Sequence, residues 1–340
     1  MHTLKGRFRG TLLGAAVGDA LGAQFEGVNI IKRSALEELM EEPRNLRYTD
    51  DTHMMLGLAS SLVECGGFNG HHMANLFARN YFAEPWRGYG SGPPQVFKLI
   101  VQGVPWHKAS SLLFGGSGSY GNGAAMRVAP AGLLKYRDLD LVVRIANQSG
   151  MITHSHELGM EGAVLQACAV ALLLQQPEST DLDHGAFLAA LRKFVRTPIF
   201  HQKMEQITLL LPGTSRTDVV AALGNGIASY EAIPAALYSF LCHAGSFTDA
   251  VTYAISLGGD TDTIACMTGA LSGAYLGEQS IPAVWRDRVE GAARLRELAD
   301  ALFSMATSAV SKPLTEEKVN NNHPVVYGEL QIVLSSISSK

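Results

Sequence analysis

The hydrophobic positions of the chain recur at helical spacing. Apolar residues repeat at intervals of three and four from Phe8 to Leu21 and again from Met54 to Leu62, as they do along one face of a helix. Segments 158–174 and 264–276 are apolar or small at nearly every position, which predicts helices buried on most sides, and 219–241 is rich in alanine and leucine. Alternating β-branched runs are almost absent. The sequence therefore predicts an all-α fold, a single compact orthogonal helical bundle.

Glycines stand four residues apart on two of these predicted helices. The first stripe consists of Gly14, Gly18 and Gly22, and the second of Gly269 and Gly273. A glycine inside a helix costs about 0.5–1 kcal/mol relative to alanine, so a stripe of them predicts that two backbones approach closely. We expect these two central helices to pack tightly beneath a site.

The predicted domain runs from residue 1 to 312. Within it, segment 175–212 is more polar and lacks the glycine pattern, which predicts a peripheral insertion. Ser215 and Asp218 have the spacing of a capping box and predict that a helix restarts there. The composition changes again at 313–340, which we expect to be a C-terminal tail with no assigned role.

The composition of the 340 residues argues against some classes of binding partner. A formal net charge of -4 argues against a general electrostatic grip on nucleic acid or on an anionic membrane, and no apolar stretch is long enough to span a bilayer. Asp19 interrupts the apolar run near the N-terminus, so we expect no export signal. The four cysteines have no metal-binding spacing and predict buried free thiols in a reducing compartment. These observations favour a cytoplasmic protein, which we expect to be a monomer.

Two acidic clusters share one arrangement, each followed by an apolar helical run. They are Thr49, Asp50 and Asp51 upstream, and Asp260, Asp262 and Thr263 downstream. Either cluster alone is typical of a helix cap, yet a cap needs one acid and each cluster has two. If the four carboxylates converge, their repulsion raises their pKa values unless cations lie among them. Oxygen ligands from aspartate and threonine suit two Mg²⁺ ions, with Mn²⁺ or Ca²⁺ as substitutes.

A glycine-rich stretch from Phe114 to Gly123 is suited to phosphate binding, because its backbone N–H groups are free of side-chain bulk. It also contains Gly116-x-Gly118-x-x-Gly121, the spacing of a dinucleotide fingerprint. No strand precedes it and no βαβ unit surrounds it, so a nicotinamide-dependent oxidoreductase is disfavoured. A surface loop without a ligand is the alternative.

Two further residues are candidates for the chemistry. Glu26 follows the first glycine-striped helix and is either solvated or, if it reaches the acids, a general acid or base for glycosidic cleavage. His154 precedes the buried segment 158–174. It is either a ligand contact or a histidine that caps a helix or lines the core.

Five motifs together resemble the ADP-ribosylglycohydrolase family, most closely its type-three branch, which acts on serine-linked ADP-ribose and poly(ADP-ribose). They are Arg9-Gly10-x4-Ala15-x2-Gly18-Asp19, Thr49-Asp50-Asp51-Thr52, Gly121-Asn122-Gly123-x2-Met126-Arg127, Thr153-His154 and Gly258-Gly259-Asp260-Thr261-Asp262-Thr263. The resemblance covers roughly residues 6 to 308. Phe114 with the Gly-Ser-Tyr-Gly-Asn run at 118–122, and Leu-Gly-Asn-Gly-Ile-Ala at 223–228, point to the branch.

The resemblance implies an all-α fold with two Mg²⁺ ions in a cleft. It implies that the ligands of these ions are Thr49, Asp50, Asp51, Asp260, Asp262 and Thr263. Glu26 would be the catalytic carboxylate on a mobile loop beside the ions. The distal ribose and diphosphate would be held by Gly88, Ser119, Gly121, Asn122 and His154, and Phe114 and Tyr120 would pack around the nucleotide.

The implied activity is Mg²⁺-dependent hydrolysis of the C1''–O bond of ADP-ribose attached to serine, in poly(ADP-ribose) or in O-acetyl-ADP-ribose. ADP-ribosylated proteins or ADP-ribose derivatives would then be the substrates, with no direct nucleic-acid binding. Two alternatives stay open at this point. One is an N-glycohydrolase of arginine-linked ADP-ribose, and the other is a catalytically silent ADP-ribose-binding paralogue.

Overall fold

The computed structural model describes residues 3–41, 46–177, 181–211 and 214–308. Within these ranges the regular secondary structure is helical and contains no strand; a single isolated bridge joins Gly121 to Ala228. Residues up to Ala306 belong to one compact unit. The predicted all-α class is confirmed.

Seventeen α-helices and five short 3-10 turns are found in the described ranges. The helices are α1 (Leu4–Gly22), α2 (Arg33–Glu41), α3 (Asp50–Cys65), α4 (Gly70–Ala83), α5 (Gly92–Val101), α6 (Trp106–Ala109), α7 (Ala129–Leu134), α8 (Leu139–Met151), α9 (Glu157–Leu174), α10 (His184–Arg192), α11 (Pro198–Leu210), α12 (Arg216–Leu223), α13 (Ser229–Cys242), α14 (Phe247–Ser256), α15 (Thr261–Leu276), α16 (Ala283–Arg286) and α17 (Ala292–Thr307). The 3-10 turns are η1 (Ala23–Phe25), η2 (Ser110–Leu112), η3 (Phe114–Gly116), η4 (Asn122–Ala124) and η5 (Glu278–Ser280).

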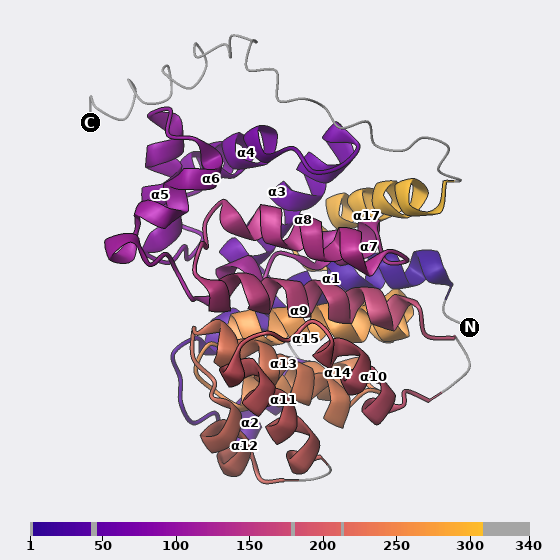
Figure 1. Ribbon diagram of the computed structural model, residues 1–340. Coiled ribbons are helices and arrows are strands. Elements are labelled where there is room, and N and C mark those ends of the chain that lie inside the picture. The colour runs from indigo at the N-terminus through magenta and orange to yellow at the C-terminus, as the bar shows by residue number, and fades with distance from the viewer. Residues whose placement is uncertain (1–2, 42–45, 178–180, 212–213, 309–340) are drawn as a thin grey trace. The chain divides into compact units, whose positions relative to one another are not determined.

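An antiparallel pair of helices, α1 and α15, forms the centre of the bundle (Figure 1). A Cβ atom on Gly10 would lie 2.5 Å from the carbonyl oxygen of Gly273, and one on Gly14 would collide with the carbonyl of Gly269. Four residues further along α1, Gly18 meets the backbone of Ala265 in the same way. Such distances leave no room for a side chain, so the glycine stripes have the packing role that their spacing predicts.

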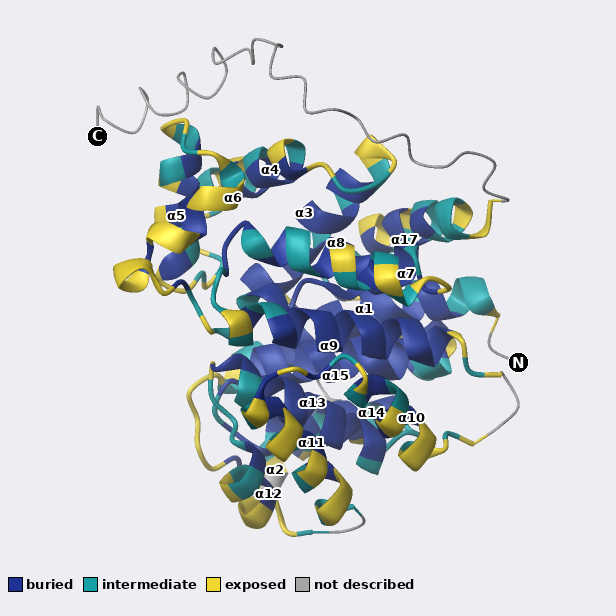
Figure 2. Ribbon diagram, in the orientation of Figure 1, coloured by how far each residue is buried: buried dark blue, intermediate teal, exposed yellow. Residues whose placement is uncertain are grey.

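Helix α9 lies alongside this centre and is buried almost all round (Figure 2). It packs against α7, α8, α13 and α15. The expectation that no apolar stretch is long enough to span a bilayer was wrong for α9, which in the described part of the chain is the one helix long and apolar enough to do so. Of that apolar window, 78% is buried inside the fold. A core helix passes the same length and composition test, so burial accounts for its hydrophobicity.

Segment 175–212, predicted as a peripheral insertion, contains α10 and α11. Their apolar faces join the main core through Phe187, Leu191, Phe200 and Met204, all at most 2% exposed. The predicted helix restart is confirmed, because the Ser215 hydroxyl accepts a bond from the Asp218 backbone N–H and donates to its carboxylate. The boundary at 312 stays a prediction, and the tail 313–340 lies outside the described residues.

The four cysteines are free thiols. Cys168 and Cys266 are buried, as predicted, but Cys65 is exposed and Cys242 is partly exposed. Burial was the wrong expectation for Cys65 because it is the last residue of α3, where Gly66 in a left-handed conformation turns the chain toward solvent.

Candidate metal centre and active site

Each predicted acidic cluster lies at the N-terminus of a helix, and the fold brings the two clusters together. Thr49 is the N-cap of α3, its hydroxyl accepting a bond from the Asp51 backbone N–H at 3.3 Å. Asp260 precedes α15 but makes no side-chain cap bond. Across the interface, the Thr263 hydroxyl lies 3.4 Å from Oδ1 of Asp51. Capping therefore explains Thr49 and leaves the acids available for another role.

A fifth carboxylate, Asp19 of α1, organises the start of α3, a role that the sequence motifs do not predict. Its two oxygens accept bonds from the backbone N–H and the hydroxyl of both Thr49 and Thr52, at 2.6–3.1 Å. Asp19 is fully buried. The signal that could have identified it is an acid in the middle of an apolar helix, since a buried carboxylate needs several donors to persist.

The five carboxylates lie in surroundings that disfavour their charged forms. Burial, opposed by the bonds from Thr52 and Thr49, raises the pKa of Asp19 to about 7, and burial together with the charge of Asp260 raises the pKa of Asp262 to about 7. The pKa values of Asp50 and Asp51 are raised well above the ordinary range, first by burial and then by neighbouring carboxylates, and burial raises the pKa of Asp260. Among the described residues, no lysine, arginine or histidine forms an ion pair with any of them.

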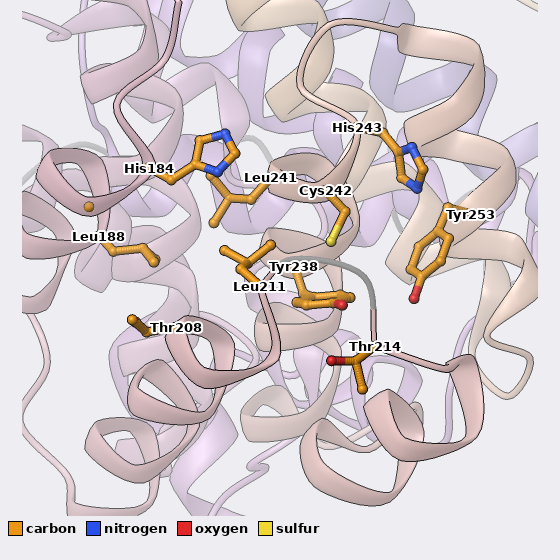
Figure 3. Close-up of a pocket in the computed structure, with 11 residues that line it drawn as sticks. His184, Leu188, Thr208, Leu211, Thr214, Tyr238, Leu241, Cys242, His243 and Tyr253 are labelled. Atoms are coloured by element: carbon orange, nitrogen blue, oxygen red, sulfur yellow. The ribbon is translucent and has the colours of Figure 1, made fainter.

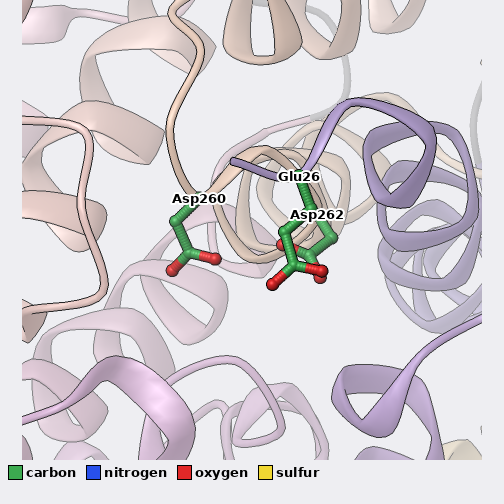
Figure 4. Close-up of side chains that lie close together, drawn as sticks. All are labelled: Glu26, Asp260 and Asp262. Atoms are coloured by element: carbon green, nitrogen blue, oxygen red, sulfur yellow. The ribbon is translucent and has the colours of Figure 1, made fainter. Parts of the chain in front are cut away.

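The donor atoms fit hard metal cations. Oδ2 of Asp51 is buried and has no hydrogen-bond partner among the described residues, and a buried carboxylate oxygen without a partner is energetically costly unless a cation binds it. Glu26, Asp260 and Asp262 each offer an oxygen, and these oxygens lie within 4.8 Å of one another. Figure 4 shows the three side chains with their carboxylates gathered together. An all-oxygen set of this kind suits Mg²⁺, Mn²⁺ or Ca²⁺.

Glu26 reaches the acids because its loop is attached to the segment that precedes α15. The Gly27 backbone N–H donates to the carbonyl of Gly259 at 2.9 Å, and the Gly259 N–H donates to the carbonyl of Val28 at 3.1 Å. Glu26 itself is exposed to solvent, and its pKa is raised first by the charge of Asp262 and then by partial burial. An exposed carboxylate beside a buried acidic cluster is placed to exchange protons with bulk water.

The glycine-rich stretch is held against the acids by backbone bonds. The Asn122 N–H donates to the Ile227 carbonyl at 2.9 Å and the Ser229 N–H to the Tyr120 carbonyl at 3.0 Å. The side-chain amide of Asn122 donates to Oδ2 of Asp260, so Asn122 directly joins this loop to the acidic cluster. The two sequence motifs predicted to mark the branch, 118–122 and 223–228, are therefore paired with each other.

Ser119, Phe114 and Tyr120 are the remaining predicted substrate residues of the glycine-rich stretch. The Ser119 hydroxyl accepts a bond from the Gly121 N–H at 3.2 Å. Phe114 and Tyr120 are large aromatic residues with 53% and 50% of their surface exposed. Phe114 has a positive φ of 53°, which is costly for a residue with a side chain.

Gly88 and His154 border the acids and the glycine loop respectively. A Cβ atom on Gly88 would lie 3.7 Å from Oδ1 of Asp50, and the neighbouring Arg87 fixes this loop through a two-bond pair with Glu290. His154 is 4% exposed, and a Cβ atom on Gly121 would lie 3.6 Å from its Nε2 atom. The N-cap of α9 is His156, so capping does not account for His154.

A cavity of about 670 Å³ lies elsewhere, among α10, α11, α13 and α14 (Figure 3). Its walls are mostly apolar and aromatic, with Leu188, Leu241, Tyr238 and Tyr253 among them. None of the predicted site residues lines it. None of the described residues that line it carries a carboxylate, the group that glycosidic chemistry requires.

Comparisons with known proteins identify the relatives of this chain. The family described as ADP-ribosylglycohydrolase matches residues 1–311. ADP-ribosylhydrolase ARH3 of Xenopus tropicalis is 38% identical over 320 residues, covering 84% of this chain and 91% of that protein. ADP-ribosylarginine hydrolase Tri1 of Serratia proteamaculans is 25% identical, covering 88% of this chain and 79% of that protein. A solved structure titled ADP-ribosylglycohydrolase-related protein complex superposes with a TM-score of 0.72 at 27% identity, covering 89% of this chain and 99% of that one.

Proposed function

Since the chain belongs to the ADP-ribosylglycohydrolase family and is therefore a glycosidase-type hydrolase, we propose that it cleaves the C1''–O bond of ADP-ribose in a Mg²⁺-dependent reaction. The proposed substrates are ADP-ribose attached to serine, poly(ADP-ribose) and O-acetyl-ADP-ribose, and the product is free ADP-ribose. The observation that carries the proposal is the approach of Glu26 to Asp260 and Asp262, with their oxygens within 4.8 Å.

The proposed ligands of two Mg²⁺ ions are Thr49, Asp50, Asp51, Asp260, Asp262 and Thr263. Their oxygen chemistry, the raised pKa values of the acids and the orphaned Oδ2 of Asp51 support this assignment. When bound, the cations would offset the carboxylate charge and polarise the oxygens of the ribose and of a water molecule. The same donor set would accept Mn²⁺ or Ca²⁺.

Glu26 is the proposed catalytic carboxylate. It takes the proton of a water molecule as the water oxygen bonds to C1'', while the bond from C1'' to the serine oxygen breaks. The serine oxygen leaves with the proton that Glu26 took from the water. The raised pKa of Glu26 makes it hold that proton more readily than an ordinary glutamate does. The buried carboxylates nearby stabilise positive charge that develops on the sugar ring during the reaction.

The glycine loop is the proposed nucleotide site. Backbone N–H groups of Gly121 and its neighbours, together with Ser119, Asn122, His154 and the loop at Gly88, would contact the distal ribose and diphosphate. The exposed rings of Phe114 and Tyr120 would pack on the nucleotide. ADP-ribosylated proteins and ADP-ribose derivatives are accordingly the proposed partners.

A second candidate is hydrolysis of arginine-linked ADP-ribose, which the 25% identity to a protein named ADP-ribosylarginine hydrolase favours. The higher identity to ARH3 over a similar share of the chain favours the first candidate. We also propose that the protein acts as a monomer in a reducing, cytoplasmic setting, in keeping with its free cysteines; light scattering in solution would test the monomer.

The experiment that tests the proposal measures release of ADP-ribose from a serine-linked ADP-ribosylated peptide and from a matched arginine-linked peptide, each with Mg²⁺ and with a chelator. We expect Mg²⁺-dependent release from the serine peptide alone. Release from the arginine peptide alone would replace the substrate and keep the metal site. Binding of ADP-ribose without release from either peptide would establish the silent-paralogue alternative.

The catalytic role of Glu26 is tested by Glu26→Gln in the same assay. We expect turnover to fall by about 10²- to 10⁴-fold, the usual contribution of a general acid or base. ADP-ribose binding, measured by calorimetry, should stay within about threefold of the unchanged protein because the glycine loop is intact. Near-normal turnover would reject this role.

A further inference from the structure

Arg127 is a fully buried cation without a carboxylate partner among the described residues. Its guanidinium donates to the carbonyl of Gly123 at 2.6 Å, to the carbonyl of Ser149 at 2.9 Å and to the Thr153 hydroxyl at 2.8 Å. It also lies over the ring of Phe77, 5.1 Å from the centroid. Burying a charge costs free energy, so packing alone does not explain an arginine at this position.

Thr153 connects this cation to His154. Its Oγ1 atom lies 2.8 Å from Nη2 of Arg127 and 2.8 Å from Nδ1 of His154. A guanidinium only donates hydrogen bonds, so the bond to Arg127 uses a lone pair of the hydroxyl. The hydroxyl hydrogen then has one acceptor among the described residues, the Nδ1 atom of His154.

This arrangement fixes the tautomer of His154. If Nδ1 accepts from Thr153, the single hydrogen of the neutral imidazole is on Nε2. The opposite tautomer, with hydrogen on Nδ1, would leave the hydroxyl hydrogen of Thr153 without an acceptor. Thr153 is 1% exposed, and an unsatisfied buried donor is unfavourable. Burial, with a further contribution from the Arg127 charge, lowers the pKa of His154 to about 3, so the ring is neutral at neutral pH.

The Nε2 edge of His154 borders the glycine loop. A Cβ atom on Gly123 would lie 3.1 Å from Nε2, and one on Gly121 would lie 3.6 Å from it. Within the described residues, Nε2 has no hydrogen-bond partner. The absence of side chains at these two positions leaves this nitrogen beside the loop that is proposed to hold the nucleotide.

We propose that Arg127 and Thr153 are positioning residues that hold His154 as a neutral Nε2–H donor to an oxygen acceptor of the nucleotide, a diphosphate or ribose oxygen. The identity of the acceptor rests on the proposed function, whereas the tautomer does not. A neutral donor binds an oxygen through direction and distance rather than through net charge. It therefore favours an acceptor of defined position over anions in general.

The tautomer is tested by ¹⁵N NMR of the eleven histidine rings at neutral pH, with the His154 signal assigned by its loss in His154→Gln. We expect a neutral ring with hydrogen on Nε2 in the unchanged protein, and a mixture of tautomers in Thr153→Val, which keeps the shape and removes the hydroxyl. A hydrogen on Nδ1, a charged ring, or an unchanged spectrum in Thr153→Val would each overturn the proposal. This result is independent of whether any substrate is hydrolysed.

The consequence for binding is tested with the same variant. We expect Thr153→Val to raise the KM for the ADP-ribosylated substrate and the Kd for ADP-ribose by about two- to tenfold, the range for one lost hydrogen bond, with kcat changed less than KM. Thr153→Ser, which restores the hydroxyl, should return both values toward normal.

The matched control is Thr11→Val on α1. Thr11 is also fully buried, and its hydroxyl donates to the carbonyl of Arg7 at 2.8 Å, away from the nucleotide loop. We expect it to lower stability without changing KM, Kd or the His154 signal. Equal effects of Thr11→Val and Thr153→Val on Kd would show a structural role only and overturn the proposal. Since Kd is measured with ADP-ribose itself, a protein that binds but does not hydrolyse still gives a decisive result.

Discussion

The two ends of the α1 and α15 pair use carboxylates in opposite ways. At one end, Arg9 grips Asp300 with two bonds of 2.7 Å and also pairs with Glu278, and the Arg9 guanidinium lowers the pKa of Asp300. At the other end, Asp19 and Asp262 are buried among acids and their pKa values rise to about 7.

The difference lies in the source of the countercharge. Where the protein supplies its own cation, a carboxylate is a structural anchor that is complete in the folded chain. Where the described residues supply no cation, several carboxylates lie together, and burial and mutual repulsion disfavour their charged forms. This difference supports the proposal that the acidic end binds cations from solution.

The largest effect should come from Asp51→Asn at the acidic end. Losing one ligand charge should lower kcat/KM with Mg²⁺ at least about a hundredfold, because metal ions contribute several kcal/mol to such reactions. In a chelator the same change should raise the free energy of unfolding by about 1–3 kcal/mol, because it removes a carboxyl group whose ionisation is disfavoured by burial and by the neighbouring acids. Enzyme assays measure kcat/KM, and urea unfolding measures the free energy of unfolding. A less stable variant in chelator would contradict the proposed metal site.

Asp19→Asn should rank second, because it disturbs the start of α3 without removing a proposed ligand. An amide has one acceptor oxygen where Asp19 uses two, so the hydroxyl bond from Thr49 to Oδ1 or the two bonds from Thr52 to Oδ2 are lost. We expect Mg²⁺ affinity to fall about 10- to 100-fold, as for other groups that orient metal ligands. Calorimetric titration with Mg²⁺ measures it.

The matched control for Asp19→Asn is Glu161→Gln. Glu161 of α9 is also a buried carboxylate that accepts backbone bonds, from Arg196 and Thr197 before α11. We expect a comparable loss of stability from both variants and unchanged Mg²⁺ affinity in Glu161→Gln. Equal loss of affinity in both would mean that general destabilisation, not orientation of α3, is responsible.

Two glycine substitutions in α1, one near each end of its contact with α15, test whether the two ends have different roles. Gly18→Ala and Gly10→Ala each push a methyl group into the backbone of α15, and each should cost about 1–3 kcal/mol of unfolding free energy. Only Gly18→Ala lies beside Asp19, so only it should also weaken Mg²⁺ binding. Gly67→Ala, where a Cβ atom would meet nothing within 4 Å, is the control. Weaker Mg²⁺ binding in Gly10→Ala would contradict the assignment of metal binding to the acidic end alone.

The stability of the metal-free protein should fall as the pH rises from about 4 to about 7. Asp19 and Asp262 have folded-state pKa values of about 7, above the ordinary value of 3.8. The folded state therefore holds more protons than the unfolded state in this window, and their loss destabilises it. Thermal unfolding in chelator across this range measures the slope. Mg²⁺ should raise stability most at the upper end, since it binds the ionised carboxylates; a slope unaffected by Mg²⁺ would count against the site.

Much of the fold was predictable because helical packing leaves a local signature. The periodicity of 54–62 and the glycine spacing on 14–22 each record one face of a helix. The membership of segment 175–212 in the core was less visible, since Phe187 and Phe200 come from short helices whose polar faces dominate the composition. The two acidic clusters were visible because each is contiguous in sequence.

Residues that orient other side chains, rather than contacting a ligand themselves, are harder to identify from the sequence. Asp19 and Arg127 belong to quoted motifs, yet the motif alone does not separate a ligand from the residue that orients it. Arg9 belongs to the same first motif as Asp19 and lies in the ion-pair network at the opposite end of α1. Which of them borders the site depends on contacts with α3 and α17, and pairings over hundreds of residues cannot be read from local spacing.

The smallest effect should come from Asp300→Asn at the ion-paired end. Arg9 lowers the folded-state pKa of Asp300 below the ordinary value of 3.8. The contribution of the pair to stability is therefore present above that ordinary value and is lost as the pH falls through the lower folded value. This is the opposite sign from Asp19. Because the pair is partly exposed, with side chains 29% and 31% accessible, we expect a loss of only about 0.2–1 kcal/mol at neutral pH, reduced further by salt. Urea unfolding at two salt concentrations measures it, and kcat/KM should not change. A fall in Mg²⁺-dependent activity would mean that the anchoring end of the helix pair also sets the geometry of the acidic end.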